Sequence, residues 1–491
     1  MRKIKIIPVL FALMFLIAPA SHVKAETSYY TYNYDYWANE TESPDAYVPE
    51  QVILGQDLGV GHMKEPQGLF VRGDRVYICD SGNHRIIEAE YKNETFTLIR
   101  VIDRFLLNGE ESTFKYPQDI YVTEEGNLYI CDTDNQRVVV LDKDLNYINR
   151  IEKPTDETID VFSDFYPMKI VVDRADRVYL LVKNVNKGLM EYDQNGKFSG
   201  YIGANEVKVS LTDYFWKIFS TKAQRSQMEL FVPTEYNNLA LDSDGFIYVT
   251  TITFSEDELM DDKAKPIRKL NTMGKDILIK NGYYPPIGDI NWGSAGGVGG
   301  SSKFSDIVAL ENETYLAVDR VRGRIFGYDF QGNLLYAFGG LGNKAGYFQY
   351  PSAIEDIEDK IMVLDYRNSS LTVMKLTQYG TRINEALAEY KKGNYKASSD
   401  KWEEVLKLNG NYDLAYIGIG RSLLREGRYE EAMEYFELKY DDVNYSKAFK
   451  LYRKEWIEAN IGKVLVVLVI LIVVPKVIKI IRKIRREVLG G

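Results

Sequence analysis

Aspartate recurs at one position of a repeated pattern in the middle of the chain. The recurring residues are Asp80, Asp132, Asp319 and Asp365. A ring of such carboxylates would suit cation binding, because hard metal ions prefer oxygen ligands. An aspartate at the end of a strand can instead accept hydrogen bonds from backbone N–H groups of its own turn. Recurrence in the copies favours this second interpretation, since a position that repeats with the fold builds the repeat.

Arginine follows three of these aspartates five residues later, as Arg85, Arg137 and Arg324. We predict that each pairs with the aspartate of its own copy and does not contact a ligand. Cys79 and Cys131 directly precede two of the aspartates. Equivalent positions in neighbouring repeats are too far apart for a disulfide, so we predict two small buried strand residues.

Histidine is scarce, with three residues in 491. His22 falls in a predicted signal peptide, and removal of that peptide leaves His62 and His84. Two histidines cannot supply a three-histidine metal centre, and two cysteines exclude a cysteine-rich zinc site.

Six segments of the chain share one pattern of short alternating strands, turns and the Asp–Arg spacing. They begin near residues 66, 117, 167, 233, 304 and 350. Four short strands in each segment of about 45–50 residues predict the blades of a β-propeller. We expect residues 47–58 to close the ring by pairing with the last blade. Residues 204–230 and 253–303 are insertions.

The segments YICDSGNHRII (77–87) and YICDTDNQRVV (129–139) resemble the NHL-repeat family, and the likeness extends over about 66–376. This resemblance implies a six-bladed propeller. Lactonases of the related gluconolactonase type use a Glu/Asn/Asp metal site on the propeller axis. Glu65 is the weak match to the first of those ligands, and no asparagine or aspartate partner accompanies it. The sequence identifies no cofactor.

Residues 1–25 have the basic start, apolar run and small residues of a signal peptide. Cleavage after Ala25 competes with cleavage at 18–20, and an uncleaved anchor is the other interpretation. Near the other end, 461–481 are apolar enough to span a bilayer, although a basic helix lying in the interface is the alternative. Basic residues after 481 predict a cytoplasmic end.

Two segments between the propeller and the apolar stretch, 393–402 and 427–436, are 34 residues apart and resemble a tetratricopeptide pair. The chain therefore divides into the following expected parts. They are a signal peptide (1–25), a Tyr-rich leader (26–46), an NHL-type propeller (47–378), tetratricopeptide-like helices (379–455), a transmembrane helix (457–481) and a basic tail (482–491).

Charge is divided between these parts. The net charge of −10 includes +4 in residues 1–25 and +6 in residues 461–491, which leaves −20 for residues 26–460. A body this acidic is a poor ligand for a polyanion, so nucleic acid is excluded as a partner.

Exposed aromatic residues are the remaining candidates for contact with a ligand or partner. They are Tyr30, Tyr32, Tyr34, Tyr36 and Trp37 in the leader, and Trp292 in a Gly/Ser-rich loop at 288–304. An aromatic row suits either glycan stacking or packing against the propeller. The insertion at 209–231 predicts a helix that packs on the propeller or touches the bilayer.

The sequence thus predicts a mainly β protein, with a six-bladed propeller, a small helical stack and one membrane helix. The order of its segments resembles that of membrane-anchored NHL-repeat proteins of Gram-positive bacteria. This resemblance implies that the protein works beside sugar-transport components. The leading hypothesis is an anchored extracellular scaffold, more binding protein than enzyme, that recruits a protein partner. The alternatives are a metal-dependent lactone hydrolase and a glycan-binding surface protein.

Overall fold

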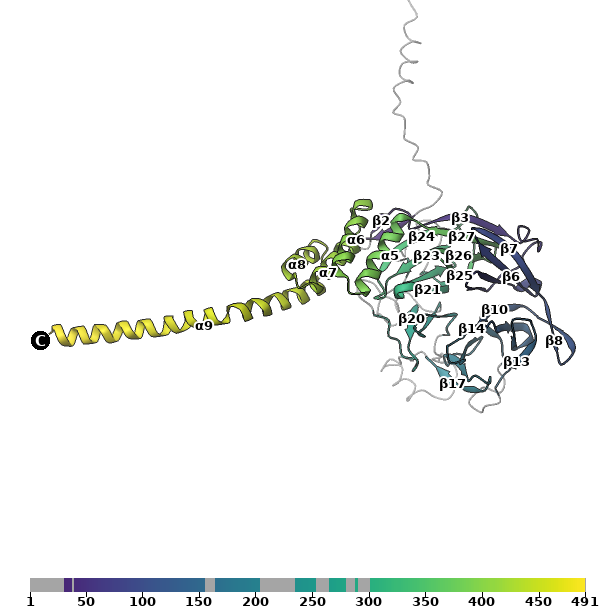
Figure 1. Cartoon of the computed structure of the whole chain (residues 1–491), viewed down its shortest axis with the longest axis horizontal. Coiled ribbons are helices and arrows are strands. Elements are labelled where there is room, and N and C mark those ends of the chain that lie inside the picture. The colour runs from purple at the N-terminus through teal and green to yellow at the C-terminus, as the bar shows by residue number, and fades with distance from the viewer. Residues whose placement is uncertain are drawn as a thin grey trace, which may run out of the picture.

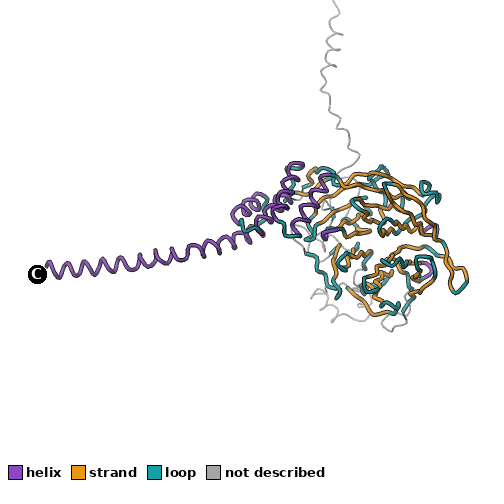
Figure 2. Tube along the Cα trace, viewed as in Figure 1, coloured by secondary structure: helices purple, strands orange, loops and turns teal. Residues whose placement is uncertain are grey.

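The protein is described here by a computed structural model of residues 31–37, 39–154, 164–203, 235–252, 265–279, 288–289 and 301–490. Strands form a ring of sheets, helices lie against one side of the ring, and one long helix projects from it (Figures 1 and 2). The predicted fold class, a mainly β six-bladed propeller with a helical stack, is confirmed.

The six blades follow one another along the chain, and the first strand of each is innermost. Blade one contains β4 (Leu69–Arg72), β5 (Arg75–Asp80), β6 (Arg85–Lys92) and β7 (Thr95–Ile102). Blade two contains β10 (Pro117–Val122), β11 (Leu128–Asp132), β12 (Arg137–Leu141) and β13 (Tyr147–Ile151). Blade three contains β14 (Pro167–Val172), β15 (Val178–Val182), β16 (Leu189–Tyr192) and β17 (Phe198–Ile202). A hairpin of β8 (Arg104–Leu107) and β9 (Glu110–Thr113) joins the first two blades.

The second half of the ring has more varied sheets. Blade four contains β18 (Asn238–Leu241), β19 (Ile247–Thr250) and β20 (Ile267–Leu270) among the described residues. Blade five contains β21 (Phe304–Ala309), β22 (Tyr315–Asp319), β23 (Arg324–Tyr328) and β24 (Leu334–Gly339), and it is extended by β1 (Tyr32–Tyr34) and β2 (Glu40–Glu42). Blade six contains β25 (Pro351–Ile357), β26 (Lys360–Asp365), β27 (Ser370–Leu376) and β3 (Tyr47–Leu54).

Strand β3 closes the ring, as the sequence predicts. It pairs antiparallel with β27 from Tyr47 opposite Leu376 to Leu54 opposite Ser370. An N-terminal strand is thereby built into the last blade. This pairing removes the free edge that β27 would otherwise expose, which is the usual hazard of an open sheet.

Apolar clusters lie between the blades. Leu69 of blade one and Met362 of blade six share one cluster, and Ile86 and Ile130 share the next. Six such clusters fill the six junctions of the described ring. Because a blade has two apolar faces, it can bury both only between two neighbours. The predicted buried cysteines occupy two of these junctions, and both are free thiols.

The helical stack follows β27 directly. It consists of α5 (Gln378–Lys391), α6 (Tyr395–Leu408), α7 (Asp413–Arg425), α8 (Tyr429–Leu438) and α9 (Asp442–Leu489). Thr377 caps α5 by accepting a hydrogen bond from the N–H of Gly380. Two glycines allow α7 to approach its neighbours closely, since a Cβ at Gly418 would meet Trp402 and one at Gly420 would meet Phe436.

The stack shares a core with the propeller. The cluster between blades five and six continues without a break into the helices, from Tyr47 and Phe338 to Trp402 and Phe436. The hydroxyl of Tyr412 also donates to the carbonyl of Leu335 on β24, at 2.8 Å. The helices therefore belong to the same packed body as the blades.

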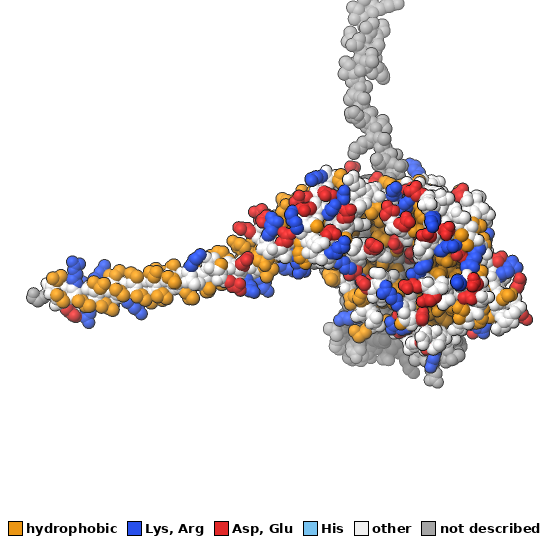
Figure 3. All heavy atoms as spheres, viewed as in Figure 1, with side chains coloured by type: hydrophobic (Ala, Val, Ile, Leu, Met, Phe, Trp, Pro, Cys, Tyr) orange, Lys and Arg blue, Asp and Glu red, His pale blue; other side chains and the backbone are white. Residues whose placement is uncertain are grey.

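Helix α9 begins in the stack and then leaves it. Its most apolar 18-residue window has a mean hydropathy of 3.0 and none of it is buried, so the helix is long and apolar enough to span a membrane. Apolar side chains cover its outer half, with basic side chains near its end (Figure 3). The predicted separate tail at 482–491 is wrong, because α9 continues through Leu489.

Several predicted features lie outside the described residues. They are the signal peptide, Tyr30, the helix at 209–231 and Trp292.

We predict that Gly420→Ala destabilises the helical stack. The new Cβ would lie 2.7 Å from the ring of Phe436, closer than packed carbons tolerate. Overpacking of this kind costs about 1–3 kcal/mol, enough to outweigh the gain of about 1 kcal/mol that alanine gives a helix. Thermal unfolding of the full chain in detergent measures the effect. Gly462→Ala, where the Cβ meets nothing within 4 Å, is the control and should not lower the melting temperature. Equal behaviour of the two variants would contradict the packing described.

Candidate functional site

One position on the inner strands carries polar side chains in four of the six blades. These residues are Asp119, Lys169, Asn238 and Asp306, and they are called the axial ring below. Gly68 and Ala353 hold the same position in blades one and six. The repeat thus gathers charged residues from separate blades around the propeller axis.

The axial ring ties neighbouring blades together. Asp119 accepts a hydrogen bond from the N–H of Ile170 in the next blade at 2.9 Å, and Asp306 accepts one from the N–H of Ile354 at 2.7 Å. Asn238 donates both to Asp306 and to the carbonyl of Ser305. These bonds satisfy the exposed edges of the inner strands, which would otherwise be unpaired in the channel.

Lys169 supplies the positive charge of the ring. Its Nζ lies 3.5 Å from Oδ1 of Asp119, and only 14% of its side chain is exposed. Burial alone would lower the pKa of Lys169, but Asp119 and Asp306 outweigh that effect and raise it. Burial raises the pKa of Asp119 to about 6, although Lys169 and the N–H of Ile170 oppose the rise. Burial also raises the pKa of Asp306.

Glu355 lies on β25 and is a further carboxyl of the channel. Among the described residues no hydrogen bond or ion pair holds its side chain, and part of its surface is open to the channel. Burial raises its pKa well above the usual value. The charges that face it are Asp356 on its own strand, Asp306 on β21, Asp119 on β10 and Lys169 on β14; the three carboxylates raise the pKa further and Lys169 lowers it.

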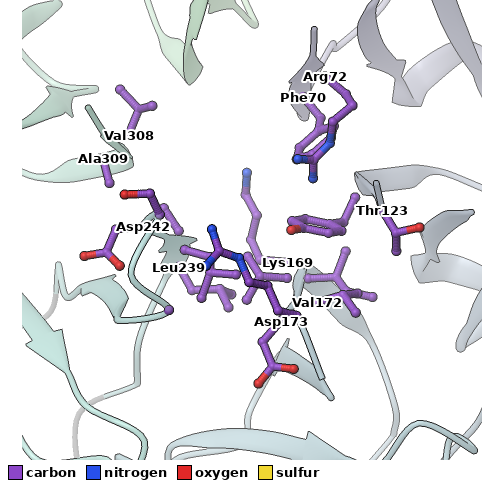
Figure 4. A pocket seen from close by; sticks show the side chains of 18 of the residues that line it. Phe70, Arg72, Thr123, Lys169, Val172, Asp173, Leu239, Asp242, Val308 and Ala309 are labelled. Atoms are coloured by element: carbon purple, nitrogen blue, oxygen red, sulfur yellow. The ribbon is translucent and has the colours of Figure 1, made fainter. Parts of the chain in front are cut away.

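A cavity of about 660 Å³, called the axial pocket below, opens where the inner strands end (Figure 4). Lys169 projects into it from one side and Arg72 from another. Its wall includes Phe70, Tyr121 and Val308. Ten acidic and four basic residues line it, so the pocket favours positive charge.

Arg72 forms part of the wall. Its Nη2 and Nε donate to the carbonyl of Val122 at 2.7 and 3.0 Å, and its guanidinium lies over the rings of Phe70 and Tyr121. Arg177 at the rim pairs with Asp173 at 2.6 Å. Both cations therefore have acceptors within the protein.

Glu65, the predicted weak metal ligand, lies just before β4, at the end of the channel where the inner strands begin. Its Oε2 accepts a hydrogen bond from the hydroxyl of Tyr116 at 3.2 Å. Within the described ranges no three His, Cys, Asp or Glu side chains come together as a group able to hold a metal ion. The residues around Glu65 therefore do not fit a lactonase-type metal centre.

The recurring aspartates lie in the turns of the blades. Asp80 accepts from the N–H of Lys64 and from Arg85, both at 2.7 Å. Asp132 makes the same contacts with the N–H of Lys115 and with Arg137.

The other two aspartates make different contacts, and for Asp319 these differ from the predicted pair with Arg324. Asp365 accepts from backbone N–H groups, including that of Gln349 at 2.6 Å. In blade five Arg322, not Arg324, pairs with Asp319 at 3.4 Å, and Arg324 lies over the ring of Tyr32. The predicted Asp319–Arg324 pair is therefore replaced by the Asp319–Arg322 pair. The guanidinium of Arg324 lies instead over the ring of Tyr32 in the leader.

In the described part of the leader, residues 31–37 and 39–46, the aromatic side chains do not form an exposed row. Tyr32 is fully buried in β1, against blade five, so its ring is not available to a ligand. The hydroxyl of Tyr34 donates to Asp289 at 2.9 Å. Tyr36 and Trp37 both contact Tyr440 in the turn between α8 and α9, although Trp37 remains 68% exposed. The leader links blade five to the helical stack.

Sequence analysis missed the axial ring, the axial pocket and Glu355. A signal for the ring was present, because Asp119, Lys169 and Asp306 are charged residues at one position of otherwise apolar inner strands. Aligning the copies at the residue two after the proline would have found it for Asp119 and Lys169. Nothing in the sequence marks Glu355 as unpaired.

Comparisons with known proteins agree with the fold. The family model described as NHL repeat matches residues 114–141, which contain the first three strands of blade two, β10 to β12. No curated protein matches the sequence.

The solved structures that the chain matches have low sequence identity to it. Virginiamycin B lyase from Staphylococcus aureus is 11% identical with a TM-score of 0.41, covering 67% of this chain and 99% of its own. A streptogramin B lyase is 12% identical with a TM-score of 0.37, covering 64% and 94%. A protein of unknown function from Bacteroides thetaiotaomicron is 12% identical with a TM-score of 0.40, covering 64% and 70%. At these values none of them bears on the chemistry of this chain.

We predict that Lys169→Met strongly destabilises the propeller. It removes the cation shared by two buried carboxylates, and breaking a buried ion pair in this way costs about 3–5 kcal/mol. Lys375→Met is the matched control, because Lys375 is 48% exposed and its pair with Glu50 is worth less than about 1 kcal/mol. Denaturant unfolding of the full chain in detergent compares them. Equal losses would show that Lys169 has no special role.

We predict that Glu355→Gln stabilises the protein at neutral and alkaline pH but not at acid pH. Below about pH 4.5 the carboxyl is protonated in both folded and unfolded chains, so the substitution changes little. Above this pH the unfolded chain ionises Glu355 more readily than the folded chain, because burial raises the pKa of the folded carboxyl; wild-type stability therefore falls as pH rises, and glutamine avoids that loss. Melting temperatures at about pH 4 and pH 8 test this. A variant that is less stable than wild type at pH 8 would contradict it.

Proposed function

We propose that the protein is a membrane-anchored scaffold that recruits a protein partner through its propeller and helical stack. The N-terminal sequence supports export of the chain, and the basic end of α9 supports a cytoplasmic C-terminus. In this arrangement the acidic body lies outside the cell and α9 crosses the membrane once.

The shared core between propeller and helices is the observation that carries this proposal. Apolar packing runs from blades five and six through α5–α8 to Ala448 at the start of α9. The described chain has no loop between the stack and the apolar half of α9. A body fixed in this way presents its surfaces at a set height above the membrane, as a scaffold requires.

The helices also support partner binding. Helices α6 and α8 begin at Tyr395 and Tyr429, and the spacing of 34 residues between them matches the tetratricopeptide period. Trp402 of α6 and Phe436 of α8 pack against the two glycines of α7. We assign this segment to the tetratricopeptide type, whose helix pairs commonly form concave surfaces for other proteins.

The partner class that we favour is a membrane complex for solute uptake. This choice rests on the order of the segments, which resembles that of anchored NHL-repeat proteins near sugar transporters. No observation favours the lactone hydrolase, since the surroundings of Glu65 do not fit a metal centre. Glycan binding through the leader is likewise not favoured, because Tyr32 is buried.

Site-specific photo-crosslinking in native membranes tests the proposal. The crosslinking residue is placed at exposed apolar positions of the full chain: Ile99 and Leu106 on the propeller, Leu408 and Leu438 on the helices. We expect one membrane-transport component to be captured at one or more of these positions. The exposed turn residue Lys143 is the control position, and it should capture less of that component. Absence of a captured protein at all four positions, at native expression, would contradict the proposal.

A further inference from the structure

We propose that the axial pocket binds a small organic cation, whose charged group pairs with the carboxylate of Glu355. This inference goes beyond the scaffold function and does not depend on it. It concerns the interior of the propeller, whereas the partner would contact its outside.

The first argument is the balance of charge. Lys169 pairs with Asp119, Arg177 pairs with Asp173, and Arg72 is bound to the carbonyl of Val122. Glu355, in contrast, has no such contact among the described residues. Arg174, the fourth basic residue of the lining, is exposed to solvent, whereas Glu355 is half-buried in the channel. Ten acidic residues against four basic ones leave the pocket short of positive charge, so the group that it lacks is a cation.

The second argument is the wall around Glu355. Its height in the channel is shared by Phe70, Tyr121, Val171, Ala240 and Val308, which are aromatic or aliphatic in each of the other five blades. At this height Glu355 is the one carboxyl among apolar side chains, which suits a ligand with one positive group on an apolar body. The volume of about 660 Å³ lies within the range of small-molecule sites, about 300–1,000 Å³.

The third argument excludes a bare metal ion. The ammonium of Lys169 already lies beside Asp119, and its charge acts on Asp306 as well. In the described part of the chain the channel carboxylates do not form a group of three that could hold a metal. An organic cation needs only one carboxylate, so the geometry favours it.

The fourth argument is the free-energy cost of burying the carboxyl group of Glu355. Burial and three nearby carboxylates disfavour the charged form of Glu355, and Lys169 offsets only part of this, so the pKa stays raised. Glutamine would fill the same space without the penalty. A cation bound beside Glu355 would offset the cost, as a ligand that binds only the folded state stabilises it.

The test uses three probes that share a phenyl ring and differ in charge at neutral pH. Benzylamine is cationic, benzyl alcohol is neutral and benzoate is anionic. Each is titrated into the full chain in nanodiscs by calorimetry, with empty nanodiscs as the blank. We expect benzylamine to bind at least tenfold more tightly than benzyl alcohol and benzoate. A single ion pair in a partly buried site changes the binding affinity by a factor of about ten.

Glu355→Gln should reduce benzylamine affinity about tenfold, to the level of benzyl alcohol, while the protein stays folded. Glu125→Gln is the matched control, because Glu125 lines the exposed rim of the same pocket, and it should change affinity less than about threefold. Three results would each overturn the proposal: no benzylamine binding up to tens of millimolar, tighter binding of benzoate, or unchanged benzylamine affinity in Glu355→Gln.

Discussion

The structure depends on the burial of both faces of every blade. A four-stranded blade with two apolar faces cannot be stable alone, so each must lie between two neighbours, and the ring must close. Here β3 completes blade six, and six apolar clusters fill the junctions of the described ring. Each blade is therefore stabilised by its neighbours, and a loss at one junction weakens the whole ring.

One of these junctions has a second role. Between blades five and six the apolar cluster extends into α5–α8, so the helices cover apolar surface that the ring does not bury itself. The hairpin of β1 and β2 strengthens the same region, because Tyr36 and Trp37 contact Tyr440 beside α9. The membrane helix is thus connected to the propeller through packed side chains on two sides.

The propeller axis follows a different physical rule from the junctions. The inner strands meet there edge to edge, and the axial ring satisfies their N–H groups with buried carboxylates. Two of these carboxylates need the shared cation of Lys169, whereas Glu355 has no partner within the described chain. Sites that carry an uncompensated cost of this kind are where proteins commonly place function. The axis therefore combines a structural network with a candidate binding site.

The sequence predicted the fold well because blades and helices repeat. The Asp–Arg spacing of the first two blades, the closing strand and the 34-residue helical spacing all have periodic signals. The sequence failed where contacts join distant segments. Arg324 was predicted to pair with Asp319, but Tyr32, almost 300 residues away, lies beneath its guanidinium. Glu355 was missed for the same reason, since its lack of a partner depends on strands from five other blades.

The central claim is that propeller and helical stack form one body. Distance measurement by electron spin resonance between labels at Ile99→Cys on β7 and Leu438→Cys on α8 tests it in nanodiscs. Both positions are exposed, and the native cysteines are fully buried and escape labelling. The shared core predicts a single narrow distance distribution. A broad or multiple distribution would show that the helices move independently of the blades and would contradict the account.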